Sequence, residues 1–245
     1  MKFEMDKVVK KSEELVKKGE GLAKDMLPKV KDATSDLKES LSTIMDKGVQ
    51  GAQNFFEKKD DVKEVLDVAT GTGDLAIAIQ KGTGAKVVGL DLSQQMLNVG
   101  AVKIKKLNLD GRISLQKGDA EQLPFEDNRF DAVSVAFGVR NFENLNKGLA
   151  ELRRVVKKEK SVYILEFSKV EGLLAPLYMF YFKNILPMIG RLVSKDNRAY
   201  TYLPDSVNAF PFGEKMKQIL LETGFKKVEY KKLSLGIATI YKATK

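Results

Sequence analysis

The stretch "EVLDVATGTGDLAIAI", residues 64 to 79, runs from an apolar strand through a glycine turn into the start of a helix. Gly71 and Gly73 lie in the turn, and Ala76 takes the place of a third small residue, so the pattern reads G-x-G-x-x-A. A strand, a glycine turn and a helix in this order are typical of the nucleotide-binding start of a doubly wound α/β fold. The spacing permits NAD, FAD or S-adenosylmethionine and does not choose among them.

The composition excludes several kinds of catalytic site. The 245 residues include no cysteine and no histidine. These absences remove disulfides, thiolate metal sites, cysteine nucleophiles, the usual general base and the serine triad. Chemistry must therefore use carboxylates, tyrosines, lysines, arginines or a cofactor, and we expect no metal site. The charged residues Lys2, Glu4 and Asp6 leave no apolar core for a signal peptide, so we expect a cytoplasmic location.

The net charge of +9 raises the question of an acidic partner. The excess of lysine and arginine lies after residue 60, where the basic residues are scattered among acidic ones. Dense interleaving of arginine and aromatic residues, which single-stranded nucleic acid needs, is absent from the sequence. The charge therefore disfavours nucleic acid and favours contact with an anionic membrane surface, or a solubilising coat.

Residues 1 to 60 form a region of their own. They have no strand signal, and their apolar residues recur eleven positions apart, as in the series Leu22, Ala33, Ile44 and Phe55. Eleven residues make three helical turns, so the recurrence predicts one apolar stripe along an amphipathic helix. We expect a helical extension that either packs its stripe on the following domain or lies on a lipid surface.

From residue 61 onward the pattern predicts one domain of alternating strands and helices. The strand candidates are "KEVLDVA", "AKVVGLD", "RISLQKGD", "FDAVSVAFG" and "SVYILEFS", with helical stretches between the first four and from Asn144 to Lys157. Strands that are apolar on both faces and separated by helices indicate a covered parallel sheet. The C-terminal tail adds two strands joined near Gly236, expected as an antiparallel edge hairpin. We therefore predict an α/β, doubly wound, mostly parallel seven-stranded Rossmann-like sheet.

The charges around the glycine turn favour one ligand. Asp74 follows Gly73 at the first turn of the helix, and Asp67 lies in the strand below, so both carboxylates oppose a pyrophosphate. S-adenosylmethionine carries an ammonium and a sulfonium, which nearby carboxylates stabilise. Asp91 ends the next strand, where a carboxylate can accept both ribose hydroxyls. Asp119, after the third strand, is placed to accept from an adenine amino group. In this order, the residues favour S-adenosylmethionine over a nicotinamide cofactor.

Several longer segments resemble one family. "VLDVATGTGD", "GDAEQLPFEDNRFDAVSVAFGVRNFENLNKGLAELRRVVK", "ILEFSK" and "SKDNRAYTYLPDSVNAFP" are similar to the C-methyltransferases of menaquinone and ubiquinone biosynthesis, with a menaquinone type the closer match. The resemblance covers residues 62 to 245 and implies the class I S-adenosylmethionine methyltransferase fold and a prenylated quinol as methyl acceptor. By position it implies that Thr72, Asp91, Asp119 and Ala120 contact the cofactor. It also implies that Arg140 and Asn141 face the acceptor.

Two features depart from that family. Its N-terminal segment has a Tyr-Asp pair, an Asn and a later Trp-Arg pair, none of which is recognisable here, so residues 1 to 60 are not expected to match. The family's Pro-Gly-Gly turn before "VYILEFS" is replaced by "KKEK" from Lys157 to Lys160, which removes turn-forming residues but keeps the strand pattern.

The chemistry of a quinol limits the catalytic candidates. Methylation of a ring carbon needs electron density, which rises when the adjacent hydroxyl, with a pKa near ~10, loses its proton. Arg140 can stabilise the oxyanion, directly or through a water, and Asn141 can orient the same oxygen. Tyr200, with Tyr202 and Asp196 beside it, is a further pocket partner or proton acceptor.

The apolar segment 172 to 193 is interrupted by Lys183, Arg191 and two prolines, so it lacks the run of roughly 20 apolar residues that a membrane span requires. It is expected either as part of an apolar lid over about residues 169 to 211 or as an ordinary core helix.

The sequence leaves three functions open. They are a quinol C-methyltransferase, a methyltransferase of another acceptor (a small phenol, a sterol or RNA), and an impaired methyltransferase-like binder of membrane surfaces. Formation of a homodimer stays open.

Overall fold

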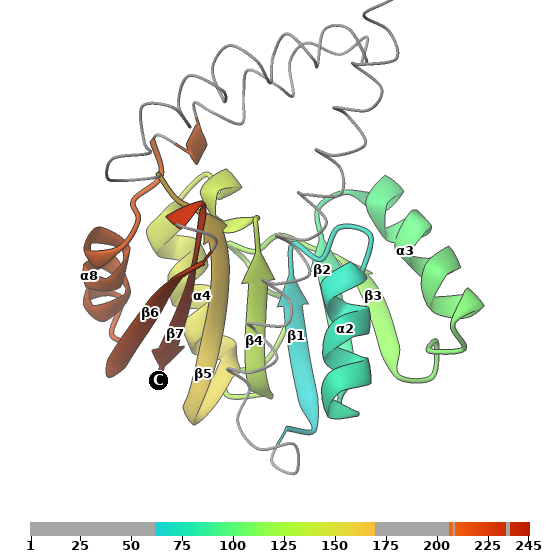
Figure 1. The fold of residues 1–245 in the computed structure, drawn as a ribbon. Coiled ribbons are helices and arrows are strands. Elements are labelled where there is room, and N and C mark those ends of the chain that lie inside the picture. The colour runs from blue at the N-terminus through green and yellow to red at the C-terminus, as the bar shows by residue number, and fades with distance from the viewer. Residues whose placement is uncertain (1–61, 170–205, 208, 234–235) are drawn as a thin grey trace, which may run out of the picture.

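The computed structural model describes residues 62–169, 206–207, 209–233 and 236–245 (Figure 1). They contain one seven-stranded sheet in the order β3-β2-β1-β4-β5-β7-β6. The strands are β1 (Glu64–Val68), β2 (Lys86–Asp91), β3 (Ile113–Lys117), β4 (Phe130–Ala136), β5 (Val156–Phe167), β6 (Lys227–Leu233) and β7 (Ala238–Thr244). The first five strands are parallel, and β7 runs antiparallel to both β5 and β6. The doubly wound sheet with an antiparallel edge is therefore confirmed.

The helices divide between the two faces of this sheet. They are α2 (Asp74–Thr83), α3 (Gln94–Lys106), the short 3-10 helix η2 (Val139–Asn141), α4 (Leu145–Val155) and α8 (Glu214–Glu222). Alternate residues of the buried strands face opposite sides, as the pleat requires. Val65 packs with residues of α2 and α3, whereas the next residue, Leu66, packs with residues of α4 and α8. The sheet is therefore covered on both faces, as its apolar strands predict.

Local sequence sets where the helices begin. Ser93 caps α3 by accepting a hydrogen bond from the backbone N–H of Met96, and Asn144 caps α4 through the N–H of Lys147. Both caps satisfy an amide that has no partner within the helix. The helix α2 instead begins after Gly73, whose φ of 78° lies in the left-handed region that glycine tolerates best. The sharp turn from β1 into α2 therefore depends on a glycine.

The prediction of helices between all of the first four strands is wrong at one place. Helices α2 and α3 follow β1 and β2, but residues 118–129, between β3 and β4, form turns and a loop. Pro124 breaks a helical hydrogen-bond pattern there. The Arg154 guanidinium of α4 donates to the carbonyl oxygens of Leu123 and Phe125 at 2.9 and 2.7 Å, so these groups have partners outside any helix. A side chain from α4 thus supplies the hydrogen bonds that these backbone carbonyl groups would make within a helix.

The "KKEK" segment lies within β5. Val156 pairs with Phe130, but Ser161 pairs with Ala132, so β5 advances by five residues where β4 advances by two. Glu159 takes up part of this bulge with a φ of 62°. The C-terminal Lys245 fastens it by accepting from the Glu159 N–H and donating to the Lys160 carbonyl. An irregular bulge therefore stands where the family has a glycine turn, and the rest of the strand keeps its register.

The predicted N-terminal extension, Tyr200 and most of the predicted lid lie outside the described residues. Within the described ranges, no helix is long and apolar enough to cross a bilayer.

Candidate active site

The glycine turn after β1 is fastened to the end of β2. Asp91, the last residue of β2, accepts a hydrogen bond from the Gly71 N–H through Oδ2 and one from the Ser93 N–H through Oδ1, each at 2.8 Å. Gly71 and Gly73 both have positive φ, 58° and 78°. One carboxylate thus holds together two neighbouring strand ends. It occupies two of the roughly four acceptor positions that a carboxylate offers, so two remain for a ligand.

Asp67 supports the same turn from beneath. Its side chain is buried and accepts from the hydroxyls of Thr70 and Ser134, each at 2.7 Å. Burial raises the pKa of Asp67 to about 6, against the two hydrogen bonds, which lower it. Asp67 is absent from the residues that line the pocket described below. The structure therefore places Asp67 beneath the turn and outside the pocket lining.

Asp74 and Thr72 belong to a small ion-pair cluster on the outer side of the turn. Lys103 Nζ lies 2.7 Å from the Asp74 carboxylate and 2.8 Å from Thr72 Oγ1, and Thr72 also donates to Asp74. Because Lys103 offsets the negative charge of Asp74, the repulsion of phosphate expected at this position is weaker than the sequence implied. The preference for a cationic ligand must come from other groups.

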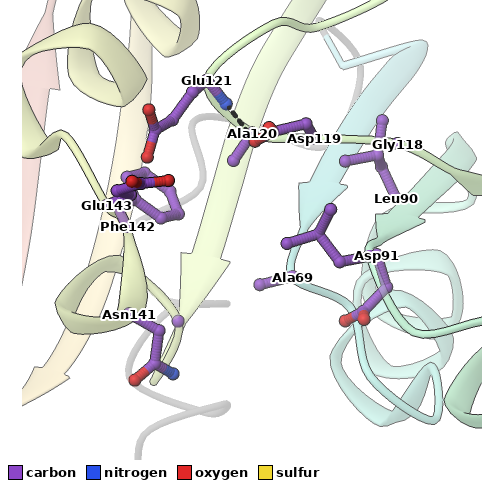
Figure 2. Close-up of a pocket in the computed structure, with 12 residues that line it drawn as sticks. Ala69, Leu90, Asp91, Gly118, Asp119, Ala120, Glu121, Asn141, Phe142 and Glu143 are labelled. Carbon is purple, nitrogen blue, oxygen red and sulfur yellow. Dashed lines mark hydrogen bonds between the residues drawn. The ribbon is translucent and has the colours of Figure 1, made fainter.

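A pocket of about 340 Å³ opens beside the ends of β1 and β2 (Figure 2). Its lining residues are Ala69, Leu90, Asp91, Leu92, Gly118, Asp119, Ala120, Glu121, Gly138, Asn141, Phe142 and Glu143. Four of them are carboxylates, and none is lysine or arginine. A dinucleotide pyrophosphate would meet only like charge in this lining, whereas a ligand with ammonium and sulfonium centres gains from it. The residues present therefore fit S-adenosylmethionine.

A second cavity, of about 430 Å³, lies near the first and shares Phe142 with it. It is lined by Val139, Arg140, Phe142, Leu145, Ser206, Ala209, Phe210 and Pro211. Among these lining residues Arg140 carries the only charge. Gly148 of α4 allows Phe142 to pack closely there, because a Cβ at Gly148 would lie 2.3 Å from the Phe142 ring. Phe142 is therefore held between an acidic pocket and an apolar cavity with one guanidinium.

Arg140 is anchored by a buried carboxylate at the end of β5. Its guanidinium donates to Glu166 Oε1 at 2.7 Å and to the Phe137 carbonyl, and its backbone N–H donates to Glu166 Oε2 at 3.2 Å. The exposed fractions of the two side chains are 11% for Arg140 and 1% for Glu166. Burial raises the pKa of Glu166, whereas the Arg140 charge lowers it. Arg140 Nε is buried without a hydrogen-bond partner among the described residues.

The structure brings some of the predicted site residues together and separates others. Asp91, Asp119, Ala120 and Asn141 line one pocket. Arg140, next to Asn141 in the chain, opens into the other cavity.

Sequence reasoning missed Glu121, Glu143 and Glu166. The signal for Glu166 was a carboxylate inside the apolar run "VYILEFS", since an acid in a buried strand requires a partner.

No cluster of three or more metal-ligating side chains occurs in the parts of the chain that the structure describes.

Comparison with known families gives a match over most of the chain. A model described as the ubiE/COQ5 methyltransferase family matches residues 36–245. The match begins well before Val62. The expectation that residues 1 to 60 as a whole lie outside the family is therefore wrong for residues 36 to 60.

Individual relatives agree with this match. The chain is 42% identical over 211 residues to the "Demethylmenaquinone methyltransferase" of Bacteroides fragilis, a similarity that covers 85% of this chain and 86% of that protein. It is 47% identical over 184 residues to the "Ubiquinone/menaquinone biosynthesis C-methyltransferase UbiE" of Citrifermentans bemidjiense, covering 74% of this chain and 78% of the relative. Among solved structures, a putative S-adenosyl-L-methionine-dependent methyltransferase of Methanococcus maripaludis has a TM-score of 0.59 at 21% identity, over 86% of this chain and 91% of that one.

Proposed function

This chain belongs to the ubiE/COQ5 methyltransferase family, and we propose that it transfers a methyl group from S-adenosylmethionine to a ring carbon of a prenylated quinol, converting demethylmenaquinol to menaquinol. The observation that carries the proposal is the pair of cavities on the two sides of Phe142. The acidic one suits a cationic methyl donor. The apolar one, with a single guanidinium, suits an oily acceptor that becomes a phenolate.

We propose the following roles for the predicted cofactor-binding residues in and beneath the acidic pocket. Asp91 is proposed to accept both ribose hydroxyls with the acceptor positions that Gly71 and Ser93 leave open. Asp119 accepts a hydrogen bond from the Glu121 N–H through Oδ1 at 2.8 Å, and its other oxygen, Oδ2, is proposed to accept from an adenine amino group. Ala120 gives the adenine ring a small apolar wall. Gly71, Thr72, Gly73 and Asp67 act by shaping the turn.

When bound, S-adenosylmethionine supplies an electrophilic methyl group on a sulfonium. The chain's own residues prepare the acceptor. Arg140 stabilises the quinol oxygen as its proton leaves to water, and Asn141 orients that oxygen from the edge of the neighbouring pocket. Glu166 is a positioning residue, because its side chain is buried behind the guanidinium and fixes it in place. Tyr200 stays a proposed partner of the acceptor.

The prenyl tail of the proposed acceptor also indicates where the enzyme works. A prenyl tail resides in a bilayer, so an enzyme that methylates the quinol ring reaches its acceptor at the membrane surface. We place this enzyme in the cytoplasm, in peripheral contact with a membrane.

The test is transfer of a labelled methyl group to a panel of acceptors. We expect methylation on a ring carbon of a demethylmenaquinol analogue, and little or none of a small phenol without a second ring, a sterol or RNA. Preferred methylation of any of those three, or an oxygen-methylated product, would overturn the proposal. Binding of S-adenosylmethionine without transfer to any acceptor would identify an impaired enzyme.

A further inference from the structure

The exposed large apolar side chains of the described residues gather on one element. They are Leu92, Met96, Val99, Val102 and Leu107, with exposed fractions between 43% and 64%. Three of them lie within α3, and the other two flank its ends. We call this set the α3 ridge. Single exposed apolar residues are ordinary on a protein surface, but a concentration on one helix marks a contact surface.

The spacing makes these residues a continuous strip. Met96, Val99 and Val102 follow one another at intervals of three, so they lie along one side of the helix. The side that packs on the sheet carries Leu97, Gly100 and Ile104, all buried. Figure 1 shows α3 at the end of the sheet where β3 is the edge strand. The exposed fractions of the ridge side chains place them on the solvent side of this helix.

Within α3 itself the charged residues have one sign, although the acidic pocket adjoins the start of the ridge and Asp74 pairs with Lys103. The helix "QQMLNVGAVKIKK" contains no aspartate or glutamate, and its last turn carries Lys103, Lys105 and Lys106. Lys105 and Lys106 are exposed, whereas Lys103 is paired with Asp74. An apolar strip flanked by exposed lysines is complementary to the interface of an anionic bilayer, where acyl chains lie beneath negative headgroups.

The ridge also adjoins the candidate active site. Leu92 at its start lines the acidic pocket. Met96 lies close to the glycine turn, since a Cβ on Gly71 would be 3.6 Å from its Cε.

We propose that the α3 ridge docks on an anionic phospholipid surface and so holds the active site beside the bilayer in which a prenylated acceptor resides. The proposal rests on the proposed function for its purpose, but the docking itself follows from the apolar strip and its lysines. Lipid is favoured over protein as the occupant, because a ridge with lysines and no acid of its own matches a continuous negative surface.

Vesicle co-sedimentation of the full chain tests the docking. The parent should bind phosphatidylcholine vesicles that contain phosphatidylglycerol. The double variant Val99→Glu, Val102→Glu should bind them at least about tenfold more weakly, because it places charge in the acyl region. Ala101→Glu is the matched control, since this exposed residue of the same helix lies about 200° from Val99. It should stay within about twofold of the parent.

Substitution of the exposed lysines provides a second, independent test of docking. Removing charge with Lys105→Gln, Lys106→Gln should weaken binding by about fivefold per lysine on the anionic vesicles, and should leave binding to pure phosphatidylcholine unchanged. Equal binding by the parent and the ridge variant would overturn the proposal, as would equal losses in the ridge variant and in Ala101→Glu.

A cysteine probe separates lipid from protein as the occupant. The chain has no cysteine, so Val99→Cys introduces a single thiol. Maleimide should label it without vesicles and more slowly with them. Slow labelling without vesicles would overturn the proposal in favour of a protein cover, and sedimentation velocity would then distinguish a second copy from residues 1 to 61.

Methyl transfer to a water-soluble acceptor distinguishes failure of the proposed function from failure of membrane docking. The ridge variant should methylate a short-tailed, water-soluble demethylmenaquinol analogue as fast as the parent. If the parent itself leaves that analogue unmethylated, the proposed function fails, and the vesicle result is judged separately.

Discussion

The acidic pocket beside Asp91 and the apolar cavity beside Arg140 lie on either side of Phe142, yet they differ in almost every property that selects a ligand. Four carboxylates line the first and one guanidinium the second. The first is formed largely by the ends of β1 and β2 and the loop after β3. The second is formed by η2, the start of α4, Ser206 and residues 209–211. One side is thus suited to a cation and the other to an apolar molecule that gains negative charge.

The two key side chains are also held differently. Asp91 is fixed by two backbone amides and keeps acceptor capacity for a ligand. Arg140 is fixed by the buried Glu166, which balances its charge. A substitution at Asp91 should therefore act on cofactor affinity, and one at Arg140 on the chemical step.

The largest expected effect is at Arg140. Arg140→Ala should lower turnover by about two to three powers of ten and leave S-adenosylmethionine affinity nearly unchanged, because one preorganised oxyanion donor is lost. Rates are measured at saturating cofactor across pH, where high pH should partly restore the variant by supplying phenolate from solution.

Arg140→Lys should recover only part of the rate, because a point charge does not reproduce the planar fork. Because Arg140→Ala leaves Glu166 buried without its partner, the double variant Arg140→Ala, Glu166→Gln controls for lost stability. If the single variant stays within a few fold of the parent, Arg140 has no role in the acceptor cavity.

The second largest effect is expected at Asp91, which lines the acidic pocket. Asp91→Ala should weaken S-adenosylmethionine binding by on the order of 2 to 4 kcal/mol, the scale of two charge-assisted hydrogen bonds. Calorimetric titration measures this, and NAD should bind neither the variant nor the parent. An unchanged affinity would show that the ribose does not bind at Asp91. Tighter binding of NAD than of S-adenosylmethionine by the parent would contradict the assignment of the acidic pocket to a cationic cofactor.

The sequence predicted the fold better than it predicted the division between the two cavities. Apolar strands, Gly71, Gly73 and Asp91 carry strong local signals, and the sheet places them as expected. The loop of residues 118–129 escaped prediction because a distant side chain, Arg154, satisfies its carbonyl groups. Arg140 and Asn141 are neighbours in sequence, and only the turn of η2 and the pairing with Glu166 direct them to different cavities.

Asp67 gives a smaller effect that appears in stability. Its pKa of about 6 in the folded protein lies above the ordinary value of 3.8, so the folded state binds the proton more tightly than the unfolded state. The free energy of unfolding should therefore fall as pH rises from about 4 to 6, by up to about 3 kcal/mol. Denaturant unfolding of the parent and Asp67→Asn across this range measures it. If the free energy of unfolding falls equally with pH in both proteins, groups other than Asp67 cause the pH dependence.

The smallest effect is expected at the Asp74–Lys103 pair, which is partly exposed at 63% and 35%. Asp74→Asn should change stability by less than about 1 kcal/mol, since solvent screens such pairs. It should change S-adenosylmethionine affinity only slightly. A tenfold loss of affinity in the same calorimetric titration would show that this pair, and not the carboxylates of the pocket lining, sets the preference for a cation.

One measurement tests the division of labour between the cavities most directly. It is the single-turnover rate of labelled methyl transfer to a soluble demethylmenaquinol analogue, followed as S-adenosylmethionine is raised to saturation, in the parent, Asp91→Ala and Arg140→Ala. Asp91→Ala should approach the parent rate once the cofactor saturates. Arg140→Ala should reach saturation at the parent's cofactor concentration but at a rate lower by about two to three powers of ten. If Arg140→Ala recovers with added cofactor, or Asp91→Ala stays slow at saturation, the assignment of cofactor and acceptor to separate cavities is wrong.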